Sequence, residues 1–221
     1  MPNKELIVHL SGLSEQEWNK ERSNHYNEIP PHDQKIRKKL FCEIYNIFED
    51  LKINVWITGG TALGAIRDNN FIAWDDDIDM DMIEDDFILN MYSIKDYLID
   101  NGFIVRLTSS NKYPKMVVFK YKMKVAIGSL KVSKGLLLRP AYKLPKHLFD
   151  SSKKISFMGM SVLIPYPPED YLKYVYGRNW KTPKKVEDDV ELYTSKYLRR
   201  PFFRIVLKRI YLKIKKMINQ L

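Results

Sequence analysis

Apolar side chains recur along the 221-residue chain with two different periods, and these periods predict helices and strands in turn. In residues 33–53, apolar positions follow at intervals of three and four, which is typical of an amphipathic helix. These positions are Ile36, Leu40, Ile44, Ile47, Phe48 and Leu51. Segment 54–58 is β-branched and aromatic and runs into Gly59-Gly60, so it predicts a buried strand that meets a turn. A short helix over 61–68 follows this turn.

The rest of the chain continues this alternation of strands and helices. Period-2 or uniformly apolar runs predict strands at 75–82, 103–109, 115–121 and 124–132, and a hairpin at 154–164. Helical patterns follow at 84–102, ending at Gly102, and at 167–177, opened by Pro167-Pro168 with acids in the first turn. A loop around Pro140 and Pro145 separates the last two groups. We therefore predict an α+β fold, in which strands alternate with helices along the chain.

Composition divides the chain into three parts. Residues 1–31 form an N-terminal extension, with a short helix predicted at 14–26 and a break at Pro30-Pro31. Residues 32–195 form a globular domain, and residues 196–221 form a basic amphipathic tail. The apolar and charged fractions, 45% and 29%, are those of a folded protein.

Cysteine content and hydropathy predict a cytoplasmic protein. Cys42 is the only cysteine, which excludes an intramolecular disulfide and a cysteine-rich zinc site. The apolar run at the N-terminus is too short for a secretory signal, and no stretch reaches the length of a membrane span.

The formal net charge of +10 is concentrated in the C-terminal tail. Residues 196–221 hold nine basic residues and no acid, so the rest of the chain is close to neutral. Apolar tail residues follow at spacings of three and four: Phe203, Leu207, Ile210, Ile214, Met217 and Leu221. This pattern predicts a helix lying on an anionic membrane surface, on the inner face of the cytoplasmic membrane. A helix docked on the domain is the alternative, and nucleic-acid binding is not expected because no basic groove with interleaved aromatics accompanies the tail.

Five aspartates between residues 75 and 81 form a candidate metal site. On a strand, side chains alternate between two faces. The acidic face would hold Asp75, Asp77, Asp79 and Asp81, and the apolar face Ile78, Met80 and Met82. Carboxylates in a row repel one another, and oxygen-only ligation suits Mg²⁺ or Mn²⁺. A solvated acidic edge strand is the alternative, whereas an EF-hand is excluded because Met80 stands where its loop requires glycine.

The glycine pair upstream of the acids is a candidate phosphate site. Gly59-Gly60 and Thr61 stand between the predicted buried strand and the start of a helix, where backbone N–H groups and the helix dipole favour an anion. Arg67, about two turns further along, adds a planar side chain suited to a bidentate contact with phosphate. A phosphate cradle, an arginine and a pair of acids in this order indicate phosphoryl-type transfer.

Three stretches resemble the LicD/fukutin-type branch of the nucleotidyltransferase superfamily, whose fold is that of polymerase-β-like enzymes. They are "LFCEIYNIFEDLKINVWI" at 40–57, "GGTALGAIRDNNFIAWDDDID" at 59–79 and "IPYPPEDYLKYVYGRNWKTP" at 164–183. The resemblance covers roughly residues 35–185. It implies a nucleotidyltransferase-type mixed β-sheet flanked by helices. Of the three stretches, the second is the most specific to the family.

The resemblance also implies an activity. Similar proteins are phosphotransferases of the LicD type, which move a phosphorylated alcohol such as phosphocholine or a polyol phosphate from a CDP-linked donor onto a sugar. Their acceptors are surface polysaccharides, teichoic acids, lipooligosaccharides, capsules or glycolipid precursors. The family's metal-binding Asp-hydrophobic-Asp falls on Asp77 and Asp79, and its glycine pair falls on Gly59 and Gly60. The implied catalytic residues are Asp77, Asp79 and Arg67, with Asp75 as a further metal ligand.

The sequence departs from the superfamily at one position. Relatives often supply a third metal-binding carboxylate from a later strand, in a Val-x-Ile-Asp context. The corresponding stretch here is "KVAIGSLKV", with Gly128 and Ser129 in place of the acid. Three interpretations stay open: Asp75 or Asp81 substitutes, the site runs with one metal ion, or activity is reduced. A nucleotidylyltransferase and a non-catalytic binding subunit are the alternative functions.

Several other residues favour packing or solvation over chemistry. Tyr176, Gly177 and Trp180 are typical of a helix end with aromatic packing. Trp74 is expected to anchor packing as well. Lys131, Lys134 and Arg139 follow the strand that lacks the acid, and a solvated basic loop is the simplest interpretation of them.

Overall fold

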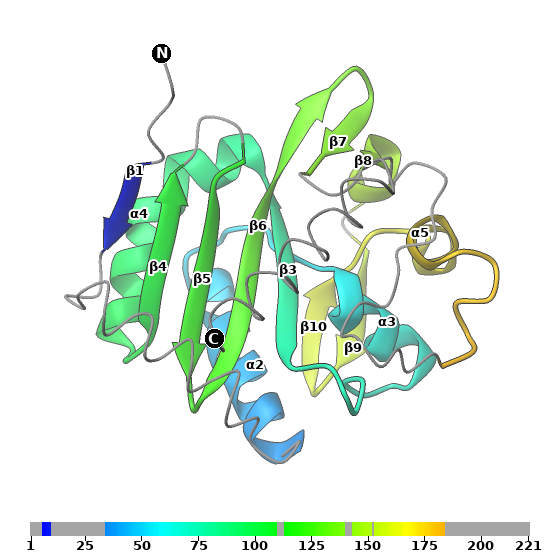
Figure 1. Ribbon diagram of the computed structural model, residues 1–221, viewed down its shortest axis with the longest axis horizontal. Helices are drawn as coiled ribbons and strands as arrows, with labels where there is room; N and C mark the ends of the chain where they lie inside the picture. The colour runs from blue at the N-terminus through cyan, green and yellow to red at the C-terminus, as the bar shows by residue number, and fades with distance from the viewer. Residues whose placement is uncertain (1–5, 10–33, 110–112, 140–142, 152, 184–221) are drawn as a thin grey trace, which may run out of the picture.

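The computed structural model describes residues 6–9, 34–109, 113–139, 143–151 and 153–183 (Figure 1). The predicted helix at 14–26 and the basic tail at 196–221 lie outside these residues.

The described residues form one mixed β-sheet, as the sequence predicted. Its order is β1 (Leu6–His9), β4 (Ile104–Ser109), β5 (Lys115–Lys120), β6 (Met123–Ser133), β3 (Asp77–Ile83), β2 (Trp56–Ile57), β10 (Met160–Leu163) and β9 (Lys154–Phe157). Two short strands, β7 (Leu136–Leu138) and β8 (Lys143–Pro145), continue from the end of β6. The pairs β3–β6 and β2–β10 are parallel, and the other pairs are antiparallel. The acidic strand β3 therefore lies inside the sheet rather than at its edge.

Four α-helices and one 3₁₀ helix among the described residues accompany the sheet. They are α2 (Gln34–Asp50), α3 (Gly59–Arg67), α4 (Glu84–Asp100), α5 (Pro168–Tyr176) and η1 (Lys146–Phe149). In the view of Figure 1, α2 and α4 lie behind the sheet, whereas α3 and α5 lie together at its β2–β10 end. The helix α3 follows β2 directly, and this connection positions the candidate site.

The amphipathic helix α2 buries its apolar stripe almost as predicted. Its core side chains are Leu40, Phe41, Ile44, Tyr45, Ile47 and Phe48. Ile36 was predicted to begin the stripe, but its side chain is 37% exposed, and the neighbouring Arg37 is buried at 3%. A charged side chain takes the core-facing position here because it finds partners in the loop before β3, as described below. Leu51 lies one residue beyond the helix and is only partly buried.

Other boundaries differ from the sequence predictions in instructive ways. The strand β3 begins at Asp77, so Asp75 and Asp76 belong to the preceding loop. Residues 6–9, inside the predicted N-terminal extension, form β1 and pair with β4 at the sheet edge. The predicted hairpin at 154–164 is present, and its turn residues Met158 and Gly159 both have positive φ, 57° and 89°.

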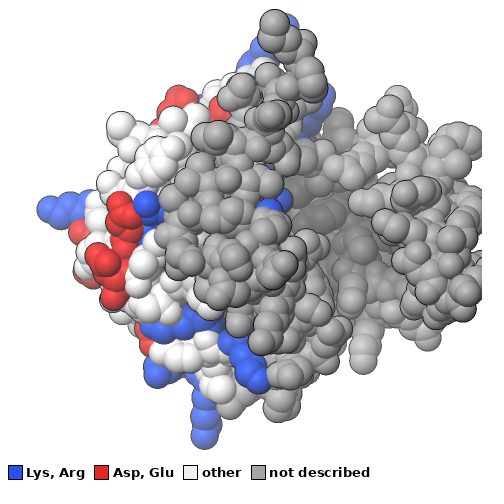
Figure 2. All heavy atoms as spheres, turned by 60° about the vertical axis from the view of Figure 1, so that its left-hand side comes forward, with Lys and Arg blue, Asp and Glu red and all other residues white. Residues whose placement is uncertain are grey.

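Basic and acidic side chains are mixed on the described surface (Figure 2), in agreement with the near-neutral net charge of the chain before its tail. Figure 2 views the end of the sheet that carries β4 and α4, and shows basic and acidic side chains close together on the described surface. Such mixing limits the electrostatic field over this face of the domain.

Candidate metal and phosphate site

The loop after α3 folds back along the helix that precedes it. Asp68 and Asn69, the latter with φ of +49°, turn the chain at the C-terminal end of α3. The returning chain passes against Gly64, where an added Cβ would lie 2.5 Å from the carbonyl oxygen of Asn70. Only glycine leaves room for this approach, since real Cβ atoms do not come so close. The loop thereby carries Asp75 back to the first turn of α3.

The glycine pair makes room for two carboxylates. A Cβ on Gly59 would lie 2.2 Å from Asp79 Oδ2, and one on Gly60 would lie 2.1 Å from Asp75 Oδ2. Gly59 also has φ of +52°, a conformation that glycine adopts without strain. The N–H of Gly60 donates to Asp79 Oδ2 at 3.2 Å. The glycines are therefore needed so that acids can lie directly against the N-terminus of α3.

The other predicted phosphate-binding groups hold neighbouring elements together. The N–H of Gly59 donates to the hydroxyl of Tyr171 on α5 at 3.0 Å. The hydroxyl of Thr61 accepts from the N–H of Asp79 at 2.8 Å, which ties α3 to β3. Of the three predicted residues, Gly60 is the one whose N–H is directed at a carboxylate of the acidic group. Tyr171 escaped the sequence reasoning because a tyrosine on a buried helix face looks like ordinary core.

The acids lie on the predicted face of β3. Asp77, Asp79 and Asp81 alternate with Ile78 and Met80, which are buried at 1% and 0% exposure. The alternation argument holds from residue 77 onward, because the strand begins there. This face of β3 points toward the helix α3, as the contact of Asp79 with both glycines shows.

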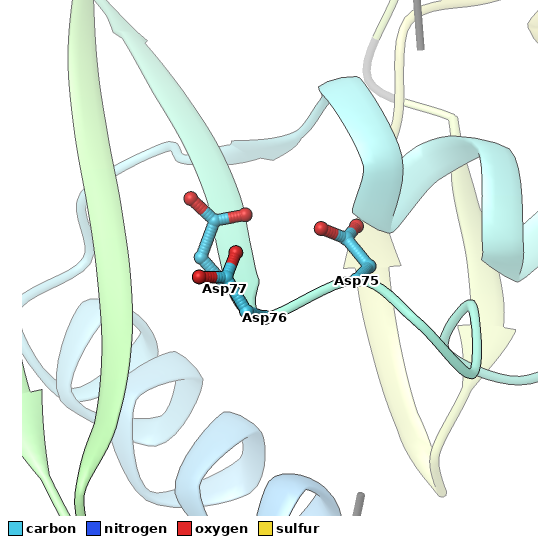
Figure 3. Close-up of side chains that lie close together, drawn as sticks. All are labelled: Asp75, Asp76 and Asp77. Atoms are coloured by element: carbon cyan, nitrogen blue, oxygen red, sulfur yellow. The ribbon is translucent and has the colours of Figure 1, made fainter. Parts of the chain in front are cut away.

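Three carboxylates could share one cation. One oxygen each from Asp75, Asp76 and Asp77 lies within 4.8 Å of the others. In Figure 3, the carboxylate of Asp75 faces the first turn of α3, and those of Asp76 and Asp77 lie beside each other. Asp76 was not predicted, since strict alternation from residue 75 assigned it to the opposite face. Its place in the loop frees it from that alternation.

The protonation behaviour of these acids also fits a cation. Burial, reinforced by the charges of Asp77 and Asp79, raises the pKa of Asp75 to about 8. Burial, followed by the charge of Asp77, raises the pKa of Asp79 to about 7. Both shifts mean that the assembled carboxylates lack sufficient positive charge nearby. An oxygen-only donor set of this kind suits Mg²⁺ or Mn²⁺, and Asp75, Asp76 and Asp77 are the carboxylates placed to share such an ion.

Arg37 fixes the loop that delivers the acids. Its Nη1 donates to the carbonyl of Ile72 at 2.9 Å, and its Nη2 donates to the carbonyl of Asp75. The guanidinium also lies over the ring of Phe71, 5.4 Å from its centroid. Burial lowers the pKa of Arg37, and the charges of Asp75, Asp77 and Asp76 oppose this. The sequence did hold a signal for this role. Arg37 is a basic residue within the apolar stripe of α2, three residues before Leu40 and four before Phe41.

Arg67 stands at the other end of α3. Its Nε and Nη2 donate to the two carboxylate oxygens of Asp68, each at 2.9 Å. With a rise of about 1.5 Å per residue, the nine-residue helix separates Arg67 from Gly59 by about 12 Å along its axis. The contact with Asp68 places Arg67 in a bidentate pair at the loop turn. The expected role of Arg67 on a donor phosphate stays a prediction.

The other side of the acidic row faces β6. In the parallel register, Asp77, Asp79 and Asp81 stand opposite Lys124, Ala126 and Gly128. Lys124 Nζ lies 2.8 Å from Asp77 Oδ2. The fully buried Asp81 accepts from Thr58 Oγ1 and from Arg139 Nη1, both at 2.7 Å.

Gly128 and Ser129 stand where the third carboxylate was expected. A Cβ on Gly128 would lie 2.4 Å from Asp81 Oδ1 and 2.9 Å from Arg139 Nη2. Ser129 is buried and donates to the carbonyl of Pro114 at 2.6 Å. The ion pair of Asp81 and Arg139 thus occupies the space that a side chain at position 128 would need. Arg139 was expected in a solvated loop and belongs to this pair instead. Asp81, held by Thr58 and Arg139, is less suited than Asp75 to replace the third acid as a metal ligand.

Similarity to known proteins identifies the family of this chain. The model of the LicD/FKTN/FKRP nucleotidyltransferase domain matches residues 52–167, more than half of the chain. The chain belongs to the LicD/FKTN/FKRP family. This membership confirms the resemblance drawn from the sequence, and the matched region contains the glycine pair, the acids, and the strands β3 and β6.

Individual proteins are similar to different parts of this LicD-family chain. Over 46 residues it is 51% identical to the lipopolysaccharide cholinephosphotransferase LicD of Haemophilus influenzae; the match covers 21% of this chain and 15% of that protein. The crystal structure of ANT(2″)-Ia with adenylyl-2″-tobramycin is similar over 63% of this chain and 76% of that chain, with 15% identity and a TM-score of 0.46. The solution structure of ANT(2″)-Ia gives 15% identity and a TM-score of 0.45, over 60% and 66% of the two chains.

Trp74 and Trp180 pack as the sequence suggested. Trp180 is 5% exposed and part of the main core, and Trp74 is partly buried against it. Cys42, expected in the core, is only partly buried, and its Sγ lies 3.7 Å from the carbonyl of Met158. Among the helices of the described ranges, none combines the length and the apolar character needed to cross a membrane.

Proposed function

We propose that this LicD-family protein is a metal-dependent phosphotransferase that acts on a CDP-linked donor. It transfers a phospho-alcohol, phosphocholine or a polyol phosphate, to a sugar of a cell-surface glycan or of its lipid-linked precursor. The observation that supports this most is the cluster of Asp75, Asp76 and Asp77 at the N-terminus of α3. The family match and the short match to a cholinephosphotransferase support the choice of reaction.

The proposed reaction exchanges the phosphoanhydride bond of the donor for a phosphodiester bond to the sugar. A sugar hydroxyl oxygen forms a bond to the phosphorus of the phospho-alcohol, and the bond from that phosphorus to the oxygen shared with CMP breaks. CMP leaves with the bonding electrons, and the hydroxyl releases its proton to water. A divalent ion bound here would neutralise charge on the donor phosphates.

The residues of the chain have separate tasks in this proposal. Asp77 and Asp79 hold the ion, supported by Asp75 and Asp76. The first turn of α3 presents its positive end to the donor phosphates, which a helix N-terminus favours. Arg37 keeps the acidic loop in place through two backbone carbonyls.

A donor screen tests the proposal directly. Purified protein is incubated with Mg²⁺ or Mn²⁺ and CDP-choline, CDP-ribitol or CDP-glycerol, and CMP release is measured with and without sugar acceptors. We expect one donor to yield CMP, Asp77→Asn to abolish the yield, and the surface variant Lys154→Met to leave it unchanged. Equal CMP release from Asp77→Asn and wild type would contradict the assignment of Asp77.

The same screen separates the alternative functions. The matched family domain is described as a nucleotidyltransferase, so CTP and ATP are included as donors. Release of pyrophosphate from one of them, with no CMP from the CDP-alcohols, would replace our proposal by a nucleotidylyltransferase. Failure of every donor, with nucleotide still bound, would favour a non-catalytic binding subunit.

The proposal includes a location on the membrane. A basic tail with no acid, at residues 196–221, suits the inner face of the cytoplasmic membrane, where a lipid-linked acceptor would be reached. Sedimentation with vesicles containing anionic lipid, compared with neutral vesicles, measures this. Equal recovery in both pellets at low salt, or none in either, would remove the membrane from the proposal.

A further inference from the structure

Two side-chain cations contact the acidic row of β3 at its two ends. Lys124 pairs with Asp77 at 2.8 Å, and Arg139 pairs with Asp81 at 2.7 Å. Both side chains are largely withdrawn from solvent, with exposures of 16% and 21%. Lys124 belongs to β6 itself, and Arg139 directly follows β7, which pairs with β6. The two cations are therefore held by the same part of the sheet.

Arg139 also lies close to the position on β6 that faces its partner Asp81. Its Nη2 lies 2.9 Å from where a Cβ on Gly128 would stand, and Gly128 is opposite Asp81 in the register. Lys124 and Arg139 therefore lie at the two ends of the acidic row, beside Asp77 and Asp81.

The strand β6 supplies no carboxylate to this side. Its eleven residues, Met123–Ser133, contain no acid, and the positions opposite the three aspartates are Lys124, Ala126 and Gly128. A pair of divalent ions lies about 3.5–4 Å apart and needs carboxylates that reach both. On the β6 side of Asp77 and Asp81, cations occupy the places where such ligands would be needed.

The opposite side of the row has the reverse arrangement. There Asp75 and Asp76 add two carboxylates beside Asp77, and the first turn of α3 closes the site. On this side the Gly60 N–H also donates to Asp79 Oδ2. The α3 side thus holds carboxylates that could share an ion, whereas the β6 side holds two cations.

We infer that Lys124 and Arg139 stand on the β6 side of the acidic row in place of further metal ligands, so that this centre binds a single ion on its α3 side. The inference rests on the proposed metal-dependent function. A fixed Lys or Arg side chain can stabilise charge on a transferring phosphate, as a metal ion does. Lys124, beside the metal-binding Asp77, is the cation that would act on this phosphate.

Counting bound ions tests the inference. Mn²⁺ is titrated into the full-length protein, alone and with CDP, and free and bound Mn²⁺ are distinguished by EPR. We expect one bound ion per chain in both conditions. Two ions per chain would overturn the inference and leave the proposed reaction intact, whereas no bound ion would overturn both. One bound ion without turnover of a CDP-alcohol would contradict the proposed reaction but would agree with the inference of a single ion.

A charge reversal at Lys124 gives a second test of the number of bound ions. Lys124→Asp removes a cation and adds a carboxylate opposite Asp77, so we expect a second, weaker Mn²⁺ site in this variant. The control is Lys154→Asp on β9, which makes the same charge change at an exposed pair with Glu49 and should still bind one ion. Circular dichroism melting confirms that both variants are folded. An unchanged count in folded Lys124→Asp would contradict the role of Lys124.

A milder variant gives a signature that a purely structural role would not produce. Lys124→Met removes a cation that competes for Asp77, so we expect Mn²⁺ to bind several-fold more tightly. Turnover of the CDP donor should nevertheless fall, by about 10-fold or more, because a fixed charge on the transferring phosphate is lost. A parallel change of Mn²⁺ affinity and turnover in the same direction would argue against the inference.

Discussion

The two ends of α3 come from one sequence motif but have opposite electrostatic states. At the C-terminal end, Arg67 and Asp68 satisfy each other through two hydrogen bonds of 2.9 Å. At the N-terminal end, Asp75 and Asp79 lie against Gly60 and Gly59 and carry raised pKa values of about 8 and 7. The helix thus separates a completed ion pair from an excess of negative charge. The excess marks the end where a cation and a donor phosphate would bind.

The largest expected difference between the ends concerns metal binding. Asp77→Asn should lower Mn²⁺ affinity and turnover by more than about 100-fold, the upper end of the effect of losing an outer-shell partner. Asp68→Asn, at the far end of the helix, should change both by less than about fivefold, as for an exposed pair. EPR titration measures the affinities. Similar losses in both variants would erase the proposed contrast.

The two arginines should differ in their effect on stability. Arg37→Met removes a buried cation that holds two loop carbonyls, so we expect a loss of about 3 kcal/mol of unfolding free energy. Arg67→Met removes the pair with Asp68, in which the arginine is 5% and the aspartate 32% exposed, and should cost about 1–2 kcal/mol because Asp68 can turn to water. Urea unfolding followed by circular dichroism gives both values. An equal loss would mean that the acidic loop does not depend on Arg37.

The glycines of α3 should separate metal affinity from stability. In Gly60→Ala, the new Cβ meets the flexible end of Asp75, so the carboxylate moves away and Mn²⁺ affinity falls by about 10-fold. The unfolding free energy should change little, since alanine favours the helix. In Gly64→Ala, the Cβ meets the backbone oxygen of Asn70, so stability falls by about 1–3 kcal/mol. A stability loss in Gly60→Ala equal to that in Gly64→Ala would contradict this separation.

The last expected effect is a pH dependence of stability. The pKa values of Asp75 and Asp79, about 8 and 7, exceed the value of about 3.9 for an aspartate in the unfolded chain. The folded state therefore binds more protons between these values, and the metal-free protein should lose stability, by several kcal/mol, as pH rises from 5 to 8. The melting temperature should fall by roughly 10 °C or more over this range, and Mg²⁺ should restore it more at pH 8 than at pH 5.

Asp75→Asn gives the control for this effect. It removes one of the two groups with a raised pKa, so the slope of melting temperature against pH should become flatter. A slope as steep as that of wild type would assign the pH dependence to other groups.

The parts of the fold that the sequence predicted are those set by local periodicity. The stripe of α2 from Leu40 onward, the alternation of Asp77 with Ile78, and the proline-led helix α5 each follow from neighbours within one or two turns. The order of the strands was not predictable in the same way, because pairing of β1 with β4 joins segments about 100 residues apart. The expectation of a mixed sheet came with the family resemblance.

The candidate site shows the same limit at the level of single residues. The alternation of Asp77 and Asp79 on one face of β3 followed from spacing, whereas their choice over Asp75 and Asp81 came from the family motif. The contacts of Arg37, Tyr171 and Lys124 were not predictable, because each reaches its partner through the fold and not along the chain. Arg67 was expected to contact a phosphate, and the structure places it in a pair with Asp68 at the C-terminal end of α3.

The crowding over Gly128 has a consequence for how this site could change. A carboxylate placed there by one substitution would collide with Asp81 and Arg139, both within 3 Å of its first side-chain atom. Replacing either of those two alone would leave the other buried without its partner. A third metal-binding acid at this position therefore requires the side-chain ends of Asp81 and Arg139 to move apart. The ion pair and the glycine are thus coupled, and a change at any one of positions 81, 128 and 139 alters the space left for the other two.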